Sequence, residues 1–297
     1  MNASAQTEDV LDVLPRTNEF QRFFRVFLGR KVVILGALVI LMLILVAIFA
    51  PLIAPYDPYQ QNLRKALQPP SRGHLLGTDS LGRDELSRII YGTQISLAVG
   101  IISVGIGAFI GMMLGLIAGY FGGITNTLIM RFIDALMAIP PIMLALAIAA
   151  ALGGGVRNVV VSLGVALIPT QARLMRGQVL TIKQADFVTA GEVIGCSDLR
   201  IMLVHIFPNC LPPLIVLITL NLGVAILAEA ALSFLGIGIT PPAAAWGAMV
   251  NDGYRNLLTH PLLSFAPGLC IVLVVLACNI VGDGLRDALD PRLRGTL

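Results

Sequence analysis

The stretch "VVILGALVILMLILVAIFA", residues 32–50, is a continuous apolar run that carries no charge. A helix needs about 20 apolar residues to cross the hydrocarbon layer of a membrane, which is roughly 30 Å thick. Hydrophobic residues make up 57% of the chain and charged residues 12%, whereas soluble domains are about 45–50% apolar and about 25% charged. We therefore predict an all-α polytopic membrane protein, with residues 32–50 in its first membrane-spanning helix.

Other apolar runs predict five further spans. They lie at about 95–117, 135–152, 156–172, 212–235 and 262–281. Six transmembrane helices place both termini on the same side of the membrane. Basic residues favour the cytoplasmic flanks of spans, and Arg25, Arg30 and Lys31 directly precede the first one. We expect both termini, and the connection between the fourth and fifth spans, to be cytoplasmic.

Charge and motif content argue against several functions. The net charge of +3 is spread over the flanks of the spans, so nucleic-acid binding is not expected. The cysteines contain no C-x-x-C pair and the histidines lie on different segments, so neither a disulfide nor a metal site is expected. The P-loop pattern G-x-x-x-x-G-K-[ST] does not occur in the sequence. We expect no catalytic residue and no cofactor in this chain.

Glycines recur every four residues in the second predicted span. Gly107, Gly111, Gly115 and Gly119 share one helix face, where a second backbone can approach closely. The neighbour is either another helix of the same chain, which we favour, or a partner chain. This repeat predicts a tight helix pair.

Other residues interrupt the apolar character of the predicted spans. Pro140, Pro141 and Pro169 lack a backbone N–H, so kinks are expected in the third and fourth spans. Glu229 lies near the outer end of the fifth span, where a carboxylate is costly unless it faces a cavity, a partner or water. Two interpretations remain open for it: a functional residue of the transport path, or an interface carboxylate satisfied by hydrogen bonds to the outer loops. Asn221 is a weaker case of the same kind.

A polar insert, "TAGEVIGCSDLRIMLVHIFP" at residues 189–208, separates the fourth and fifth spans. Apolar residues recur at i, i+3, i+4 and i+7 in two short stretches, which predicts two amphipathic helices. The first would start with Asp186 as its cap and end at Gly195 in the left-handed conformation. The second would start after the cap candidate Ser197 and end at Pro208. The two stripes are Phe187, Ala190, Gly191 and Ile194, and Leu199, Met202, Leu203 and Ile206.

These two helices would form a small apolar knob with Ala190 and Gly191 at its tip. Small residues there would let the groove of a partner close around the backbone. Periodicity alone leaves two alternatives open, because the same helix pair could instead lie on the lipid.

The insert resembles the cytoplasmic loop of ABC-importer permeases, in which E-A-A is followed after three residues by Gly and after nine more by I-x-L-P. The pattern appears here as Thr189-Ala190-Gly191, Gly195 and His205-Ile206-Phe207-Pro208. The departures from it are Thr189, Gly191, His205 and Phe207, while the spacing to Gly195 and Pro208 is kept.

Other segments are similar to the C-type permease subunit of dipeptide, oligopeptide, glutathione and nickel importers. They are, in order, "HLLGTDSLGRDELSRIIYGTQISL", "AGYFGG", "LSFLGIG", "PPAAAWGAMVNDG" and "GDGLRDALDPRLRG". This resemblance extends over nearly the whole chain from about Arg22 onward.

This resemblance implies a type I ABC importer permease fold in a bacterial inner membrane. The implied partners are a second homologous permease subunit, two ATP-binding subunits and an extracytoplasmic substrate-binding protein, beside the membrane lipid. ATP and Mg²⁺ would be bound by partner subunits, which makes this chain non-catalytic. Its cargo would be a dipeptide or oligopeptide, with glutathione or nickel as alternatives. A rival of another class is an ion-coupled secondary carrier with Glu229 as its ion site.

Residue roles and boundaries follow from the same resemblance. The residues that would couple to the ATP-binding subunits are Thr189, Ala190, Gly191, Ile194, Gly195 and Cys196. Glu229 and Asn221 would belong to the translocation path or an interface. The expected divisions are a cytoplasmic N-terminal segment with an amphipathic helix (1–31), the first transmembrane helix (32–54), an extracytoplasmic connection (55–90), a transporting core of five helices (91–284) that includes the coupling loop (177–211), and a cytoplasmic tail (285–297).

Overall fold

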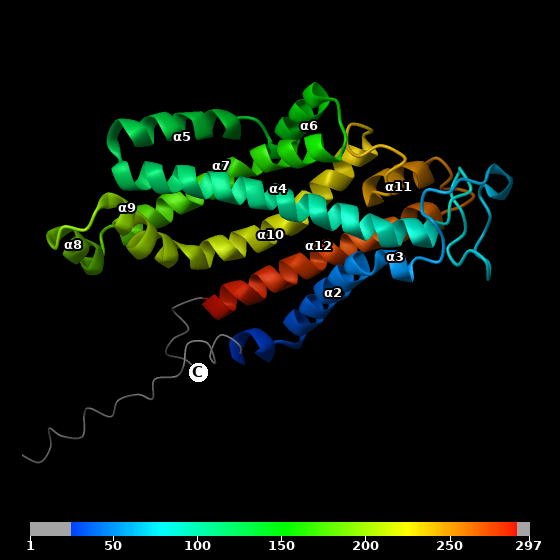
Figure 1. Ribbon diagram of the computed structural model, residues 1–297, viewed down its shortest axis with the longest axis horizontal. Coiled ribbons are helices and arrows are strands. Elements are labelled where there is room, and N and C mark those ends of the chain that lie inside the picture. Colours follow the sequence, from blue (N-terminus) through cyan, green and yellow to red (C-terminus); the bar gives the residue numbers. More distant parts are fainter. Residues whose placement is uncertain (1–24, 290–297) are drawn as a thin grey trace, which may run out of the picture.

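The computed structural model describes residues 25–289, and five of its helices are long and apolar enough to cross a membrane. They are α2 (Lys31–Ile48), α4 (Glu85–Phe121), α7 (Val156–Ile182), the continuous segment Asp198–Phe234 that ends in α10 (Phe207–Phe234), and α12 (Leu262–Leu289). The third predicted span, 135–152, overlaps α5 (Gly123–Met137) and α6 (Pro141–Leu152), and this pair, bent by 87° at a short break, makes a sixth span where it is counted as one. Residues 25–289 contain no β-strand, and the long helices run along the long axis of the molecule (Figure 1). The amphipathic helix expected within residues 1–31 lies largely outside the described residues.

Prolines act differently in the third and fourth predicted spans. α5 ends at Met137, Pro140 is extended, and α6 starts at Pro141, because a proline disfavours helical geometry in the residue before it but fits the first helical position. The expected kink is therefore a division between two helices. α7 continues through Pro169 as one helix, so this proline does not divide its span.

α4 and α7 form the closest helix pair, and the glycine repeat lies between them. A Cβ atom on Gly111 would lie 2.7 Å from the carbonyl oxygen of Ile168, and one on Gly107 would lie 2.7 Å from the Cβ of Leu167. No side chain larger than hydrogen fits these positions without moving the helices apart. The structure thus places the glycines against a helix of the same chain, which leaves α4 and α7 packed backbone to backbone.

α2 lies at the periphery of the bundle and packs along α12 (Figure 1). Gly36 of α2 approaches Ile280, and Gly284 of α12 approaches Val33. Most apolar side chains on the rest of α2 are exposed, as expected for a helix surrounded by lipid. α2 is thus an addition to the outside of the bundle.

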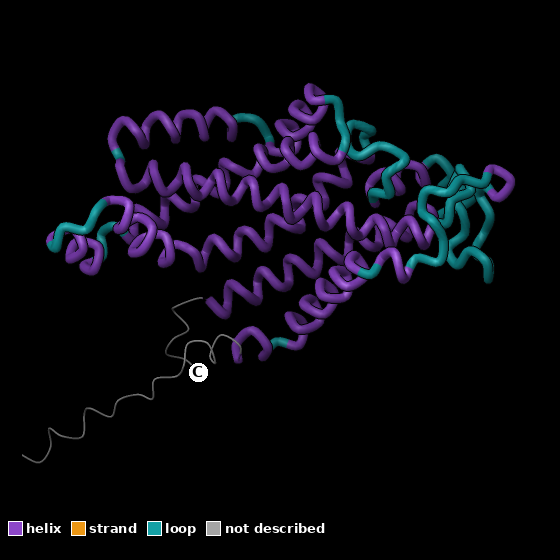
Figure 2. The backbone as a smooth tube through the Cα atoms, viewed as in Figure 1, coloured by secondary structure: helices purple, strands orange, loops and turns teal. Residues whose placement is uncertain are grey.

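Non-helical segments gather at the two ends of the bundle (Figure 2). One end carries the α3–α4 connection, residues 54–84, after the short helix α3 (Ala50–Ile53) and including η1 (Leu63–Lys65). α11 (Trp246–Tyr254) lies near it and donates a hydrogen bond from the indole of Trp246 to the carbonyl oxygen of Ile89 (3.1 Å). The opposite end carries α8 (Asp186–Val193) and α9 (Asp198–Arg200) (Figure 1).

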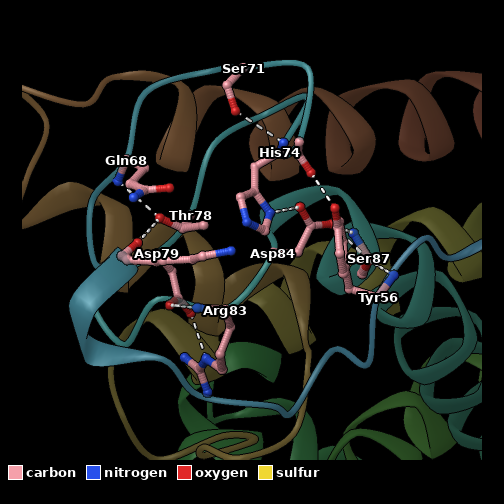
Figure 3. A network of polar contacts seen from close by, with 11 residues as sticks. Tyr56, Gln68, Ser71, His74, Thr78, Asp79, Arg83, Asp84 and Ser87 are labelled. Carbon is pink, nitrogen blue, oxygen red and sulfur yellow. Dashed lines mark hydrogen bonds and ion pairs between the residues drawn. The ribbon is translucent and has the colours of Figure 1, made fainter.

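A buried polar network fixes the α3–α4 connection to the start of α4 (Figure 3). Asp84 caps α4 by accepting hydrogen bonds from the backbone N–H and the hydroxyl of Ser87, at 2.8 and 2.7 Å. His74 lies 2.9 Å from the other carboxylate oxygen of Asp84. A capping carboxylate of this kind stabilises a helix by about 1 kcal/mol.

Candidate functional site

The helical insert, residues 186–206, consists of α8, α9 and η2 (Ile201–Ile206), a π-helical stretch. η2 runs directly into α10 at Phe207, so Pro208 lies in the first turn of α10 rather than ending a separate second helix. Pro208 has no backbone N–H to donate, and the π-helical stretch directly before it already departs from the α-helical hydrogen-bond pattern. The expectation of two separate short helices therefore holds for α8 only.

Gly195 ends α8 in the left-handed conformation, with φ +80°. Its N–H donates to the carbonyl of Glu192 and that of Cys196 donates to the carbonyl of Gly191, both at 3.0 Å. These two bonds define a Schellman motif. The prediction that this glycine ends the helix is confirmed.

Of the two expected cap residues, Ser197 lies at the cap position and Asp186 does not. Asp186 is the first residue of α8 rather than its cap, which is Ala185. Ser197 occupies the cap position of α9, but its side chain makes no capping hydrogen bond. Asp186 still places a negative charge in the first helical turn, where the helix dipole favours it.

The insert has one buried face and one exposed apolar face. Val188 and Gly191 are buried, and Gly191 faces Ile201 and His205 of η2. Gly191 is therefore on the inner face and not at the tip, where it was expected. The large apolar side chains that protrude are Phe187, Val193, Ile194 and Leu199, which are 47%, 81%, 78% and 65% exposed, and Leu203 and Val204 of η2, which are 44% and 58% exposed.

Of the six residues expected to couple, four are exposed: Thr189, Ala190, Ile194 and Gly195. Cys196 is half-buried, and Gly191 is buried. Ile194 and Gly195 thus lie beside Val193 at the end of α8. Val193 was missed because it falls off the i, i+3, i+4, i+7 stripe, although its place in the helix-ending turn could have revealed it.

Contacts that hold the insert to the bundle were not predictable from motifs. The Tyr120 hydroxyl, at the end of α4, donates a hydrogen bond to the carboxylate of Asp198 (2.7 Å). The Lys183 ammonium donates to the carbonyl oxygen of Tyr120 (2.7 Å). A cluster of buried apolar residues fills the space between α4, α7, α8 and η2. It includes Leu116, Met175, Val179, Val188, Ile201 and Ile206.

Glu229 is fully buried, at 0% exposure. Its carboxylate accepts hydrogen bonds from Ser96 of α4 (3.3 Å) and from Ser233 of α10 (2.8 Å). The Ser233 hydroxyl oxygen in turn accepts from the backbone N–H of Ile239 (2.9 Å). Asn221, two turns earlier in α10, is also buried, and its amide nitrogen has no hydrogen-bond partner among the described residues. The geometry of Glu229 is that of a carboxylate satisfied by its own chain.

A second buried charged cluster, which was not predicted, lies at the start of α4. Asp79 pairs with Arg83 at 2.6 Å and with Arg88 at 3.5 Å, and Arg83 lies 3.8 Å from Asp252 of α11. Glu85 is buried beside them. Alternating charges in "GRDELSR" were the available sequence signal. Within residues 25–289, no three His, Cys, Asp or Glu side chains are placed to hold a metal ion.

Comparisons with known proteins agree with this architecture. Residues 111–295 match the family described as binding-protein-dependent transport system inner membrane component. Residues 18–70 match the N-terminal transmembrane domain of oligopeptide transport permease C. The chain therefore belongs to the inner-membrane permease components of binding-protein-dependent ABC importers, which are non-catalytic subunits. This membership sets aside the ion-coupled carrier.

Two individual relatives are similar to this chain over nearly its whole length. The chain is 43% identical over 276 residues to the glutathione transport system permease protein GsiD of Pectobacterium atrosepticum, covering 93% of this chain and 92% of that protein. It is 45% identical over 280 residues to GsiD of Escherichia coli O6:K15:H31, covering 93% and 91%.

A solved structure shares the fold. An inward-facing MetNI methionine ABC transporter chain superposes with a TM-score of 0.56 at 20% identity, covering 69% of this chain and 97% of that one. The type I importer permease fold is therefore confirmed.

Proposed function

We propose that this permease imports a short peptide, with glutathione, a tripeptide, as the first cargo to test. The observation that carries the proposal is the identity of 43–45% over 93% of the chain to glutathione permeases. Dipeptides, longer peptides and nickel remain the alternatives, since selection would also depend on a binding protein and a second permease chain.

An uptake assay distinguishes these cargoes. Cells that lack this chain are compared with complemented cells for uptake of labelled glutathione, labelled dialanine, a labelled pentapeptide and ⁶³Ni²⁺. Restoration of glutathione uptake by complementation supports the proposal. If complementation restores uptake of another cargo and leaves glutathione uptake unchanged, the proposal is contradicted and that other cargo replaces glutathione.

The helical insert is the proposed contact with two ATP-binding subunits, which would bind ATP and Mg²⁺. The exposed apolar side chains of Phe187, Val193, Ile194 and Leu199 support this role, because they lie in the α8–α9 segment at one end of the bundle (Figure 1) and grouped exposed apolar residues are typical of an interface. Gly195 adds a turn with open space around it.

The proposed orientation places the insert and both termini in the cytoplasm and the α3–α4 connection outside. Basic residues that flank the spans support it. The connection and α11 would then face an extracytoplasmic binding protein. Residues 32–54 would form the first transmembrane helix, residues 55–90 an extracytoplasmic connection, and residues 91–284 the transporting core with its coupling loop at 177–211.

Buried amide and carboxylate groups in α10 are the remaining candidates for the translocation path. Asn221, which has an unpartnered amide nitrogen, fits a path residue better than Glu229, which has two serine partners. We therefore assign Glu229 a structural role between α4 and α10.

A further inference from the structure

We infer that Tyr120 is a positioning residue that transmits movement of the helical insert to the α4–α7 pair. This inference rests on the proposed function of the insert as the contact with the ATP-binding subunits. The inference names Tyr120 as the joint, meaning the residue through which movement at that contact would reach the membrane-spanning helices.

Tyr120 lies where three elements meet. Its side chain is buried, at 5% exposure, in the penultimate position of α4. The hydroxyl donates to Asp198, the first residue of α9, at 2.7 Å. Lys183, directly after α7, donates to the Tyr120 carbonyl oxygen at 2.7 Å, and its ammonium lies 4.9 Å from the centre of the Tyr120 ring. One residue therefore joins α4, the end of α7 and the insert.

The hydroxyl differs in kind from the apolar contacts around it. Packing of Val188 and Ile201 against Val179 is non-directional, so it favours closeness without fixing an orientation. A 2.7 Å hydrogen bond to a carboxylate fixes both distance and direction, and such charge-assisted bonds are stronger than neutral ones. The Tyr120–Asp198 bond is a side-chain hydrogen bond that ties the start of α9 to α4.

α4 and α7 are closely packed on the other side of Tyr120. A Cβ on Gly119 would lie 2.8 Å from the Cβ of Val179, and one on Gly115 would lie 2.8 Å from the Cβ of Met175. The glycines thus bring the backbone of α4 directly against α7, and close packing of this kind transmits a displacement from one helix to the other. A displacement of Asp198 that pulls on Tyr120 would move both helices together, and α4 extends from Tyr120 to the capped end at Asp84.

The test uses the complete transporter in proteoliposomes and compares Tyr120→Phe with the wild type. Phenylalanine keeps the ring under Lys183 and loses only the bond to Asp198, whose exposed carboxylate is then hydrated by water. The measured quantity is cargo imported per ATP hydrolysed, with labelled glutathione, dialanine, a pentapeptide and ⁶³Ni²⁺ as probes, using whichever the wild type imports. We expect a fall of roughly three- to tenfold, which matches the loss of one hydrogen bond.

Matched variants separate positioning from folding and docking. Asp198→Asn retains an acceptor oxygen and should keep the ratio near that of the wild type, whereas Asp198→Ala should match Tyr120→Phe, and the double variant should be no worse than either. Thr127→Val, on an exposed threonine of α5 whose hydroxyl donates to the carbonyl oxygen of Gly123 in the same helix (3.0 Å), is the control for loss of a side-chain hydroxyl. Co-purification of the ATP-binding subunits should be unchanged in all of them.

Two results would overturn the inference: an unchanged ratio in Tyr120→Phe, or loss of the ATP-binding subunits in that variant, which would make the hydroxyl a docking group. Failure of the proposed docking itself would be seen separately, as retention of the ATP-binding subunits by a Gly195→Arg variant.

Discussion

The Glu229 carboxylate in α10 accepts a hydrogen bond from Ser96 of α4, a residue that lies 133 positions earlier in the chain. This contact links two membrane-spanning helices through a carboxyl group that is closed off from solvent. Hydrogen bonds to a buried polar group add only modestly to the free energy of unfolding when all partners are present. Removing one partner lowers that free energy more strongly, because a buried group is left without a hydrogen bond.

We therefore expect Glu229→Ala to destabilise the protein by about 1–3 kcal/mol, because the hydroxyls of Ser96 and Ser233 lose their acceptor. Glu229→Gln should be milder, since its amide still offers one acceptor and one donor. The measurement is the temperature at which half of the detergent-purified complex remains monodisperse. Asn221→Ala is the control and should change that temperature less than Glu229→Gln; equal stability of Glu229→Ala and the wild type would refute the structural role.

The glycine repeat yields a matched pair of variants in one helix. Gly111→Ala places a methyl group 2.7 Å from the carbonyl oxygen of Ile168, so we expect a loss of about 1–3 kcal/mol in stability from overpacking. Gly105→Ala meets no atom within 4 Å and should be neutral or up to about 1 kcal/mol more stable, because alanine favours helix. Membrane abundance and heat resistance of the two variants check this, and similar values for both would contradict the packing argument.

Substitutions at Gly195 distinguish a defect in docking of the ATP-binding subunits from a defect in folding. Arginine and alanine at this position both accept the left-handed conformation at a cost of roughly 1 kcal/mol, and both side chains enter open space in the isolated chain. We expect Gly195→Arg to insert at the abundance of Gly195→Ala but to lose the ATP-binding subunits in a tagged pull-down, because only the bulky charged side chain collides with a bound partner. Gly195→Asn, which tolerates this conformation, should retain them.

Membrane orientation is tested by cysteine labelling. Cys196 is half-buried, whereas Cys210 and Cys278 are buried. A membrane-impermeant maleimide should label Cys196 in inverted vesicles and not in intact cells. A Leu258→Cys variant that also carries Cys196→Ser should show the opposite pattern, because Leu258 is fully exposed between α11 and α12. Labelling of Cys196 from outside would reverse the proposed orientation.

Structural features that depend on residues close together in the chain could be predicted from the sequence. Apolar runs located the spans, and Gly195 ended α8 because only a residue that tolerates a positive φ suits that turn. The stripe in α8 could not say which of its residues face inward, since that depends on where η2 lies. Gly191 was therefore placed on the wrong face.

Long-range contacts were outside the reach of pattern reasoning. Tyr120 and Asp198 are 78 positions apart, and no periodicity connects them. The charged cluster around Asp79 requires α11 to fold back over the start of α4, which no local signal predicts. Pro208 was taken as a helix end because proline stops helices from within, yet it also fits the first turn of one.

The pairing of α2 with α12 affects how the chain is made. The guanidinium Nη1 of Arg30, directly before α2, lies 2.5 Å from the carboxylate Oδ2 of Asp287, near the end of α12. The first and the last of the long helices are therefore in contact. A ribosome releases the first of them long before the second exists. During synthesis α2 must therefore stay in the lipid without its partner helix. The bundle can close only once the chain has been synthesised through α12. This gives the cell a simple physical difference between full-length and truncated chains.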